Sequence, residues 1–164
     1  MRYLWLIRHA KTSEAAAGQS DHQRVLSERG QRDSKVMTPW LSSHDKPAEW
    51  VWTSTATRAV ATAQYVADAF SCPIVEEESL YLAAPQALMD VIRTTPPEIE
   101  NVAVVAHNPG LTQLCNLLTS DSVTDNLVTF GSALFGTDAD WSHLTYSNNY
   151  FISIKSPKTV SPVS

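Results

Sequence analysis

Short, continuous runs of apolar residues alternate along this chain with longer segments in which apolar residues recur every three or four positions. A continuous run of about five apolar residues is typical of a strand that is buried on both faces of a sheet. Residues 3–7 and 102–106 are the clearest cases. Weaker patterns predict four further strands, of which the second is a short edge strand: 49–53, 73–75, 132–135 and 150–154.

The longer periodic segments predict amphipathic helices at 27–43, 56–70, 85–93 and after Asn108. Ser27 is suited to cap the first of these helices. Pro39 has no backbone N–H, so we expect it to kink the same helix. Asn108 is expected to cap the last helix, with Pro109 at its first position, where the missing N–H costs nothing.

Strands that alternate with helices predict an α/β fold with three layers, in which a mostly parallel central sheet carries helices on both faces. Residues 1–155 are expected to form a single domain, because the chain has 164 residues. Residues 156–164 are rich in Pro and Ser and are expected to be a flexible C-terminal tail. Residues 10–25 are small and polar and predict a long loop, and loops of this length are often functional.

Composition limits the classes of function. Apolar residues make up 43% and charged residues 18% of the chain, as in an ordinary soluble globular protein. The net charge of −5 argues against nucleic-acid binding, and no apolar run is long enough to span a membrane. The apolar run at 3–7 is too short for a signal peptide, so we expect a cytoplasmic protein. Cys72 and Cys115 form neither a CxxC pair nor a zinc spacing and are expected to be buried thiols.

Polar residues of one chemical kind follow three predicted strands. Arg8 and His9 follow the first, Arg58 lies in the first turn of the helix after the second, and His107 follows residues 102–106. Ligands of α/β proteins bind at the carboxyl ends of the strands. A cation in the first turn of a helix opposes the helix dipole unless an anion lies there. The pattern therefore indicates a site for a phosphoryl group.

Simpler explanations exist for each of these residues taken alone. Arg58 could point into solvent, and each histidine could be a structural residue. His9, His107 and Asp21 could also bind a metal, but the neighbouring arginines would repel a dication and no metal-binding spacing is present. The remaining histidines lie in polar stretches and are expected to be solvated: His22, His44 and His143.

Four motifs resemble those of the histidine phosphatase superfamily, which includes the cofactor-dependent phosphoglycerate mutases. Arg8-His9-Ala10 resembles its RHG/RHA signature, and Asp21 to Gly30 resembles the D-x-x-R-x-L-[ST]-x-x-G pattern of its SixA-type phosphohistidine phosphatases. Ser54 to Ala63 is similar to its S-P-A-x-R-A-x-x-T-A helix start, and Ala106-His107-Asn108-Pro109 to its second histidine motif. The resemblance implies a phosphoglycerate mutase-like fold.

The resemblance also implies roles for individual residues. His9 would be the nucleophile that becomes a phosphohistidine, while Arg8, Arg58 and His107 would bind the phosphoryl oxygens. Arg24 would be a further phosphate-binding residue of the SixA-type branch. Water would then release phosphate from His9. Neither a metal nor a cofactor is implied.

Two departures from the family pattern bear on the substrate. The proline after Ser54 is replaced by Thr55, and no clear general acid is present, with Glu78 a weak candidate. An alkoxide leaving group needs a proton from an acid, whereas the imidazole of phosphohistidine leaves more readily. The sequence therefore favours P–N over P–O substrates. The short segment 70–85 also predicts an open pocket that suits a phosphorylated protein.

The leading hypothesis is a phosphohistidine phosphatase that acts in signal transduction on a phosphorylated protein, such as a histidine phosphotransfer domain. The first alternative is a phosphatase of the same mechanism that acts on a small phosphorylated metabolite. The second is a phosphate-binding module without turnover, although such a module has no need for a nucleophile. A mutase is disfavoured, because mutases of this superfamily are longer and carry an acid.

Overall fold

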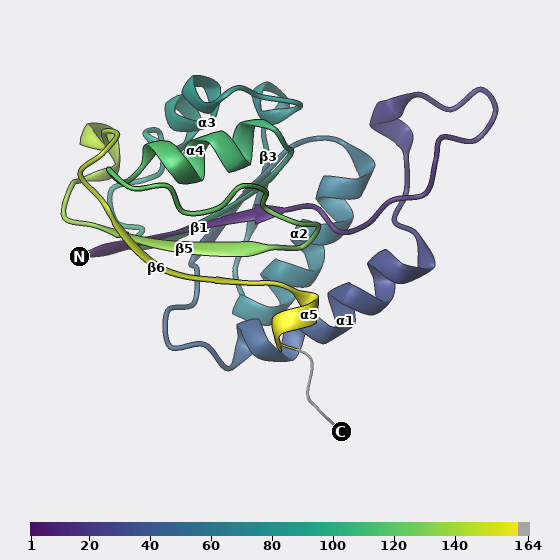
Figure 1. The fold of residues 1–164 in the computed structure, drawn as a ribbon, viewed down its shortest axis with the longest axis horizontal. Coiled ribbons are helices and arrows are strands. Elements are labelled where there is room, and N and C mark those ends of the chain that lie inside the picture. Colours follow the sequence, from purple (N-terminus) through teal and green to yellow (C-terminus); the bar gives the residue numbers. More distant parts are fainter. Residues whose placement is uncertain (161–164) are drawn as a thin grey trace.

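The computed structural model describes residues 1–160 (Figure 1). Six strands form one sheet: β1 (Arg2–Arg8), β2 (Trp50–Thr53), β3 (Ile74–Glu76), β4 (Asn101–Ala106), β5 (Ser132–Thr137) and β6 (Tyr150–Lys155). Five α-helices accompany it: α1 (Glu28–Ser42), α2 (Thr57–Phe70), α3 (Pro85–Ile92), α4 (Gly110–Leu117) and α5 (Pro157–Val160). Three short 3₁₀ helices span Asp21–Gln23, Glu78–Leu80 and Trp141–His143.

The sheet has the strand order β3-β2-β4-β1-β5-β6. Neighbouring strands from β3 to β1 are parallel, while β5 is antiparallel to both β1 and β6. The predicted α/β fold with a mostly parallel sheet is therefore confirmed, and β3 lies at an edge as expected. Because β1, β2 and β4 are adjacent and parallel, their carboxyl ends meet at one edge of the sheet.

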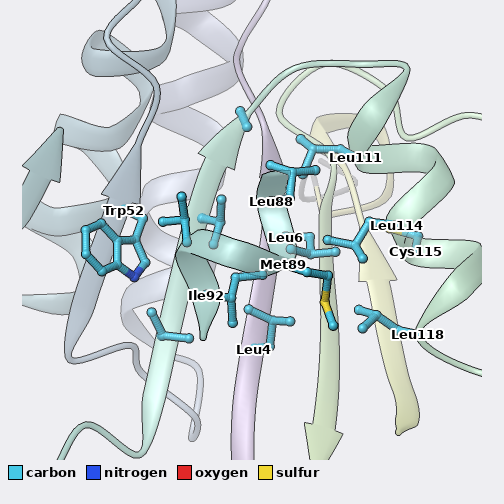
Figure 2. Packing of buried hydrophobic residues seen from close by; sticks show 14 of the residues in the cluster. Leu4, Leu6, Trp52, Leu88, Met89, Ile92, Leu111, Leu114, Cys115 and Leu118 are labelled. Carbon is cyan, nitrogen blue, oxygen red and sulfur yellow. The ribbon is translucent and has the colours of Figure 1, made fainter. Parts of the chain in front are cut away.

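Each face of the sheet is covered by its own hydrophobic cluster, which explains the continuous apolar runs. In β1, Leu4 and Leu6 contribute to the cluster under α3 and α4, whereas Trp5 and Ile7 contribute to the cluster under α1 and α2. Figure 2 shows part of the first cluster, in which Met89 and Leu114 pack together with Leu4 and Leu6. A strand whose side chains alternate between two buried faces has no polar positions.

The helices begin close to where the sequence predicts. The Ser27 side chain accepts a hydrogen bond from the backbone N–H of Gly30, and α1 continues through the exposed Pro39 as one element. Helix α4 starts at Gly110, one residue later than expected. The side chain of Asn108 nevertheless accepts from the N–H of Thr112 at 3.1 Å and so caps the first turn.

The C-terminal segment corrects one prediction. Residues 157–160 do not form a flexible tail but the short helix α5, which lies beside α1 (Figure 1). Pro157 is buried, and Val160 packs at the border of the cluster under α1 and α2. Apolar contact with α1 therefore overrides the polar composition of the segment. Residues 161–164 of the expected tail lie outside the described residues.

Candidate active site

The predicted polar side chains meet at the edge where β1, β2 and β4 end. Arg8 is the last residue of β1 and lies opposite Ala106 in β4, so His9 and His107 follow two paired positions. Their ring centroids are 5.3 Å apart. Arg58, from the first turn of α2, reaches His9 with its Nε at 3.4 Å from His9 Nε2. We call these four residues the floor of the site: Arg8, His9, Arg58 and His107.

The hydrogen bonds of His9 define which ring nitrogen carries the proton. Nδ1 lies 2.8 Å from the carbonyl oxygen of Ala10, and a carbonyl can only accept, so Nδ1 is protonated. Nε2 then keeps its lone pair and accepts from Arg58. Burial, aided by the positive charges of Arg58 and Arg8, lowers the pKa of His9 to about 4, although the bond to Ala10 opposes this. The ring is therefore neutral and nucleophilic at neutral pH.

His107 is also held neutral. Its Nε2 lies 2.7 Å from the Ser54 hydroxyl, and burial, followed by the charged forms of His9 and Arg58, lowers the pKa of His107 to about 3. Its Nδ1 is buried and, within residues 1–160, has no hydrogen-bond partner. Since the Ser54 hydroxyl can donate to Nε2, Nδ1 can carry a proton that it offers to a ligand.

Arg8 has a similar unpaired nitrogen. Its Nη1 donates to the carbonyl of Leu127 at 3.2 Å, while its Nε is buried and has no partner in the described part of the chain. Buried donors without partners are costly unless water or a ligand satisfies them. Arg8 Nε and His107 Nδ1 are thus two donors that an oxyanion could satisfy.

Arg58 does not point into solvent; only 3% of it is exposed. Its Nη1 donates to the backbone carbonyl of Asp21 at 2.7 Å, and its Nη2 pairs with the Asp21 carboxylate at 3.1 Å. An anion therefore lies at the start of α2, as the helix dipole favours, and here it is a side chain of the long loop. The Nε edge of the guanidinium remains directed toward His9.

Three residues form a solvent-facing rim, by which we mean Asp21, His22 and Tyr81. The Tyr81 hydroxyl donates to the Asp21 carboxylate, and its ring lies 4.9 Å from that of His22 and 5.4 Å from that of His107. The Asp21 side chain is 46% exposed, whereas His22 and Tyr81 are half-buried. The Tyr81 phenol bond, and then the Arg24 and Arg58 guanidinium groups, hold the pKa of Asp21 well below its usual range against partial burial.

The structure places Arg24 at the outer side of this rim. Its Nη1 pairs with Asp21 at 3.2 Å, its Nη2 donates to the Thr12 hydroxyl at 2.6 Å, and its Nε donates to the carbonyl of Ser13. Arg24 therefore braces the long loop through contacts within that loop. Its charge also acts on His9, whose protonated form it disfavours.

Backbone contacts fix the two rim segments to the core, by which we mean the loop that carries Asp21 and His22 and the turn that carries Tyr81. The Thr62 hydroxyl accepts from the N–H of Ala10, which ties the residue after His9 to α2. A Cβ on Gly30 would collide with the carbonyl of Lys11, and one on Gly110 with the carbonyl of Ala83. Helices α1 and α4 can approach these two segments only because glycine has no side chain.

Several expectations about other side chains need correction. His22 is not solvated; its Nε2 lies 2.9 Å from the Thr55 hydroxyl. His44 is packed against Trp5 and Trp40, with ring centroids 4.8 and 5.4 Å away. His143 is exposed, as predicted.

Two other predictions concerned a general acid at Glu78 and a metal site. Glu78 is exposed in its 3₁₀ helix, and no contact between it and the floor is observed. Within residues 1–160, no three His, Cys, Asp or Glu side chains are grouped so as to hold a metal ion.

Sequence reasoning missed Tyr81 altogether. Asp21 was predicted only as an alternative metal ligand or as part of a sequence pattern. Two features of the sequence could have indicated the rim: the aspartate of the D-x-x-R pattern, and Thr55 in place of the family proline.

Comparison with known proteins places these residues in a family. Residues 4–81 match the model of the histidine phosphatase superfamily (branch 1). The chain is 34% identical to the uncharacterized protein MT1313 of Mycobacterium tuberculosis over 122 residues, which cover 74% of this chain and 75% of that protein. This chain therefore belongs to the histidine phosphatase superfamily.

Solved structures define the fold more closely. The SixA protein of Nakamurella multipartitia has a TM-score of 0.85 and 22% identity, covering 95% of this chain and 96% of that one. The protein histidine phosphatase SixA complexed with tungstate has a TM-score of 0.80 and 24% identity, covering 95% and 97%. The chain thus has the SixA-type fold, which confirms the phosphoglycerate mutase-like architecture. No helix within residues 1–160 is long and apolar enough to cross a membrane.

Proposed function

We propose that the protein is a metal-independent phosphohistidine phosphatase in which His9 is the nucleophile. The observation that carries this proposal is the protonation pattern of His9. Its Nδ1–H is fixed on the Ala10 carbonyl, so the lone pair of Nε2 faces the Nε edge of Arg58. A phosphoryl group that is attacked by Nε2 would replace this 3.4 Å contact, and the Arg58 Nε–H would then donate to one of the phosphoryl oxygens.

The proposed first step transfers the phosphoryl group to His9. A bond forms between His9 Nε2 and phosphorus as the bond between phosphorus and the substrate nitrogen breaks. The electron pair of the broken bond stays on that nitrogen. Arg58 Nε, Arg8 Nε and His107 Nδ1 are the donors available to the three phosphoryl oxygens. Positioned donors of this kind supply most of the catalysis in phosphoryl transfer.

The second step releases phosphate. The oxygen of a water molecule bonds to phosphorus, and the electron pair of the P–N bond returns to His9 Nε2. One water proton leaves with inorganic phosphate or enters the solvent. His9 regains the neutral form with Nδ1 protonated, which its bond to Ala10 favours. Neither step needs a metal or a cofactor.

The state of Asp21 supports P–N rather than P–O substrates. The Asp21 carboxylate contacts the floor through its ion pair with Arg58. Its bonds to Tyr81, Arg24 and Arg58 keep it ionised at neutral pH, so it has no proton to give. An alkoxide would leave without a proton donor, whereas a phosphohistidine that is protonated on its second ring nitrogen leaves as neutral imidazole.

A phosphorylated protein suits the exposure of the site. The rim is open to solvent at Asp21, so a phosphorylated histidine of another protein would approach the floor from that side. We infer a role in signal transduction in the cytoplasm, with a phosphorylated protein such as a histidine phosphotransfer domain as the partner. This inference follows from the sequence-based expectations and the SixA-type fold.

The decisive experiment measures phosphate release from a phosphohistidine protein and from a panel of small phosphate esters. We expect turnover of the first, slow or no turnover of the second, and no change on addition of EDTA. His9→Ala should be inactive, whereas the matched variant His143→Ala, at an exposed position, should keep wild-type activity. Equal rates on simple alkyl esters would reject the P–N preference. Turnover confined to one ester would indicate a metabolite phosphatase.

A further inference from the structure

The rim differs in chemistry from the floor that it surrounds. His9 and Arg58 are 8% and 3% exposed, whereas the Asp21 side chain is 46% exposed. A phosphoryl group bound on the floor is transferred in line, so the leaving group lies on the side away from His9. It also belongs to another molecule and must extend toward solvent. The leaving group therefore comes to lie against the rim.

Two aromatic rings and one carboxylate make up this rim. The rings of Tyr81 and His22 stand edge to face, with centroids 4.9 Å apart. Asp21 has two oxygens with room for about four hydrogen bonds. Its Oδ2 accepts from Tyr81 and Arg58, while Oδ1 accepts from Arg24 and retains capacity for one more donor. Faces of aromatic rings and a carboxylate favour a planar cation.

We propose that Asp21, His22 and Tyr81 form a subsite for the leaving group that selects a protonated imidazole ring. The subsite rests on the proposed function and names the part of the substrate that the rim recognises. The ring of the substrate histidine would pack against Tyr81 and His22. Its protonated nitrogen would donate to Asp21.

The chemistry of transfer is consistent with this arrangement. Before transfer, the substrate ring carries phosphorus on one nitrogen and a proton on the other, so it bears a positive charge. When the P–N bond breaks, its electron pair stays on the ring and the charge disappears. The proton on the second nitrogen never has to move. An ionised Asp21 stabilises this protonated ring, while it would repel a departing alkoxide.

The position of His22 depends on a residue in which this chain departs from the family pattern. Its Nε2 lies 2.9 Å from the hydroxyl of Thr55, which stands where the family pattern has proline. Proline has no hydroxyl and could not hold the ring. The placement of His22 is therefore a feature of this particular sequence, whereas Asp21 belongs to the shared D-x-x-R pattern.

The test compares two substrates that share a P–N bond but differ in the leaving group. Free phosphohistidine leaves an imidazole ring, and phosphoramidate leaves ammonia. We expect Tyr81→Leu to lower the ratio of kcat/KM for phosphohistidine to that for phosphoramidate about tenfold, the effect of one good ring contact. Tyr81→Phe keeps the ring and should keep the ratio within about twofold, even where both rates fall with the lost bond to Asp21.

Two further variants complete the design. His22→Leu should lower the same ratio without removing Tyr81, and it repeats the test if Tyr81→Leu fails to fold. Tyr150→Leu is the matched control, because Tyr150 also donates to an aspartate, Asp138 at 2.8 Å, and lies at the start of the edge strand β6, remote from the site. This variant should retain the wild-type ratio and rates.

The outcomes separate the two proposals. A ratio that stays at the wild-type value in Tyr81→Leu, or in His22→Leu where that is the folded variant, overturns the subsite and leaves the phosphatase intact. A wild-type protein that hydrolyses neither P–N substrate overturns the proposed function, and the subsite with it.

Discussion

The floor and the rim of the site are built from different kinds of structure. The floor residues stand at strand ends or in the first turn of a helix, on elements whose apolar side chains belong to the two hydrophobic clusters. The rim residues stand on a long loop and in the turn after a short 3₁₀ helix. A hydrogen bond joins Tyr81 to Asp21, and a ring contact joins Tyr81 to His22. The difference suggests a division of labour, in which rigid elements hold the reacting atoms and loops recognise the rest of the substrate.

The largest expected effect comes from removing the nucleophile of the floor. His9→Ala should abolish turnover, because no other lone pair takes the position of Nε2. Binding of inorganic phosphate should persist in part, since Arg8, Arg58 and His107 remain. Activity assays and calorimetric titration with phosphate measure the two effects. Retained turnover would show that another residue is the nucleophile.

A second substitution in the floor removes a cation. Arg58→Ala should lower kcat/KM about 10²-fold or more, as is common when one stabilising donor to the transition state is lost. Arg2→Ala is the matched control, because Arg2 lies at the opposite end of β1 and pairs with Asp140. Steady-state kinetics of both variants check this prediction. Equal losses would point to a general effect of charge.

A rim substitution should have a smaller effect. Asp21→Asn removes the charge that orients Arg58 and Arg24, and we expect kcat/KM for phosphohistidine to fall about tenfold, the range of one charge-assisted hydrogen bond. Asp138→Asn, which alters the bond between Tyr150 and Asp138 remote from the site, should have no effect. An Asp21→Asn variant that is as impaired as Arg58→Ala would remove the distinction between floor and rim.

The last expected effect concerns stability in mild acid rather than turnover. His9 and His107 take up protons near pH 6.5 when unfolded but only near pH 4 and 3 when folded. The unfolded state therefore binds more protons below pH 6.5, and the free energy of unfolding should decrease as the pH falls from about 6.5 toward 4. Denaturant titrations at several pH values measure the slope. His9→Gln and His107→Gln should each make it shallower, and unchanged slopes would contradict the low pKa values.

The floor could be predicted from the sequence because its positions follow from regular structure. The apolar runs before His9 and His107 are strands, and parallel neighbouring strands end at the same edge. The same logic predicted α2 and the position of Arg58. The simpler alternative, in which Arg58 faces solvent, is excluded, because Asp21 covers its buried side chain.

The rim could not be predicted in this way. Tyr81 and Asp21 are 60 residues apart, and no local pattern shows that a loop folds back over a helix start to join them. His22 lies in a polar stretch, where solvent exposure is the natural expectation, yet Thr55 holds its ring. The helix α5 was missed for a related reason, because its packing on α1 leaves no periodic signal in four residues.

The contacts of Gly30 and Gly110 determine which parts of the sequence can evolve without loss of the active site. Each glycine lets a helix press against the backbone at the base of a rim segment, at Lys11 and at Ala83. The bases are thereby fixed to the core, while the residues beyond them are held by side-chain contacts with one another and with Thr55 and Arg58. Insertions or substitutions in the loop after Lys11 and in the turn before Ala83 would give the enzyme new substrates without disturbing His9. Directed evolution for altered selectivity would best confine its libraries to this loop and this turn.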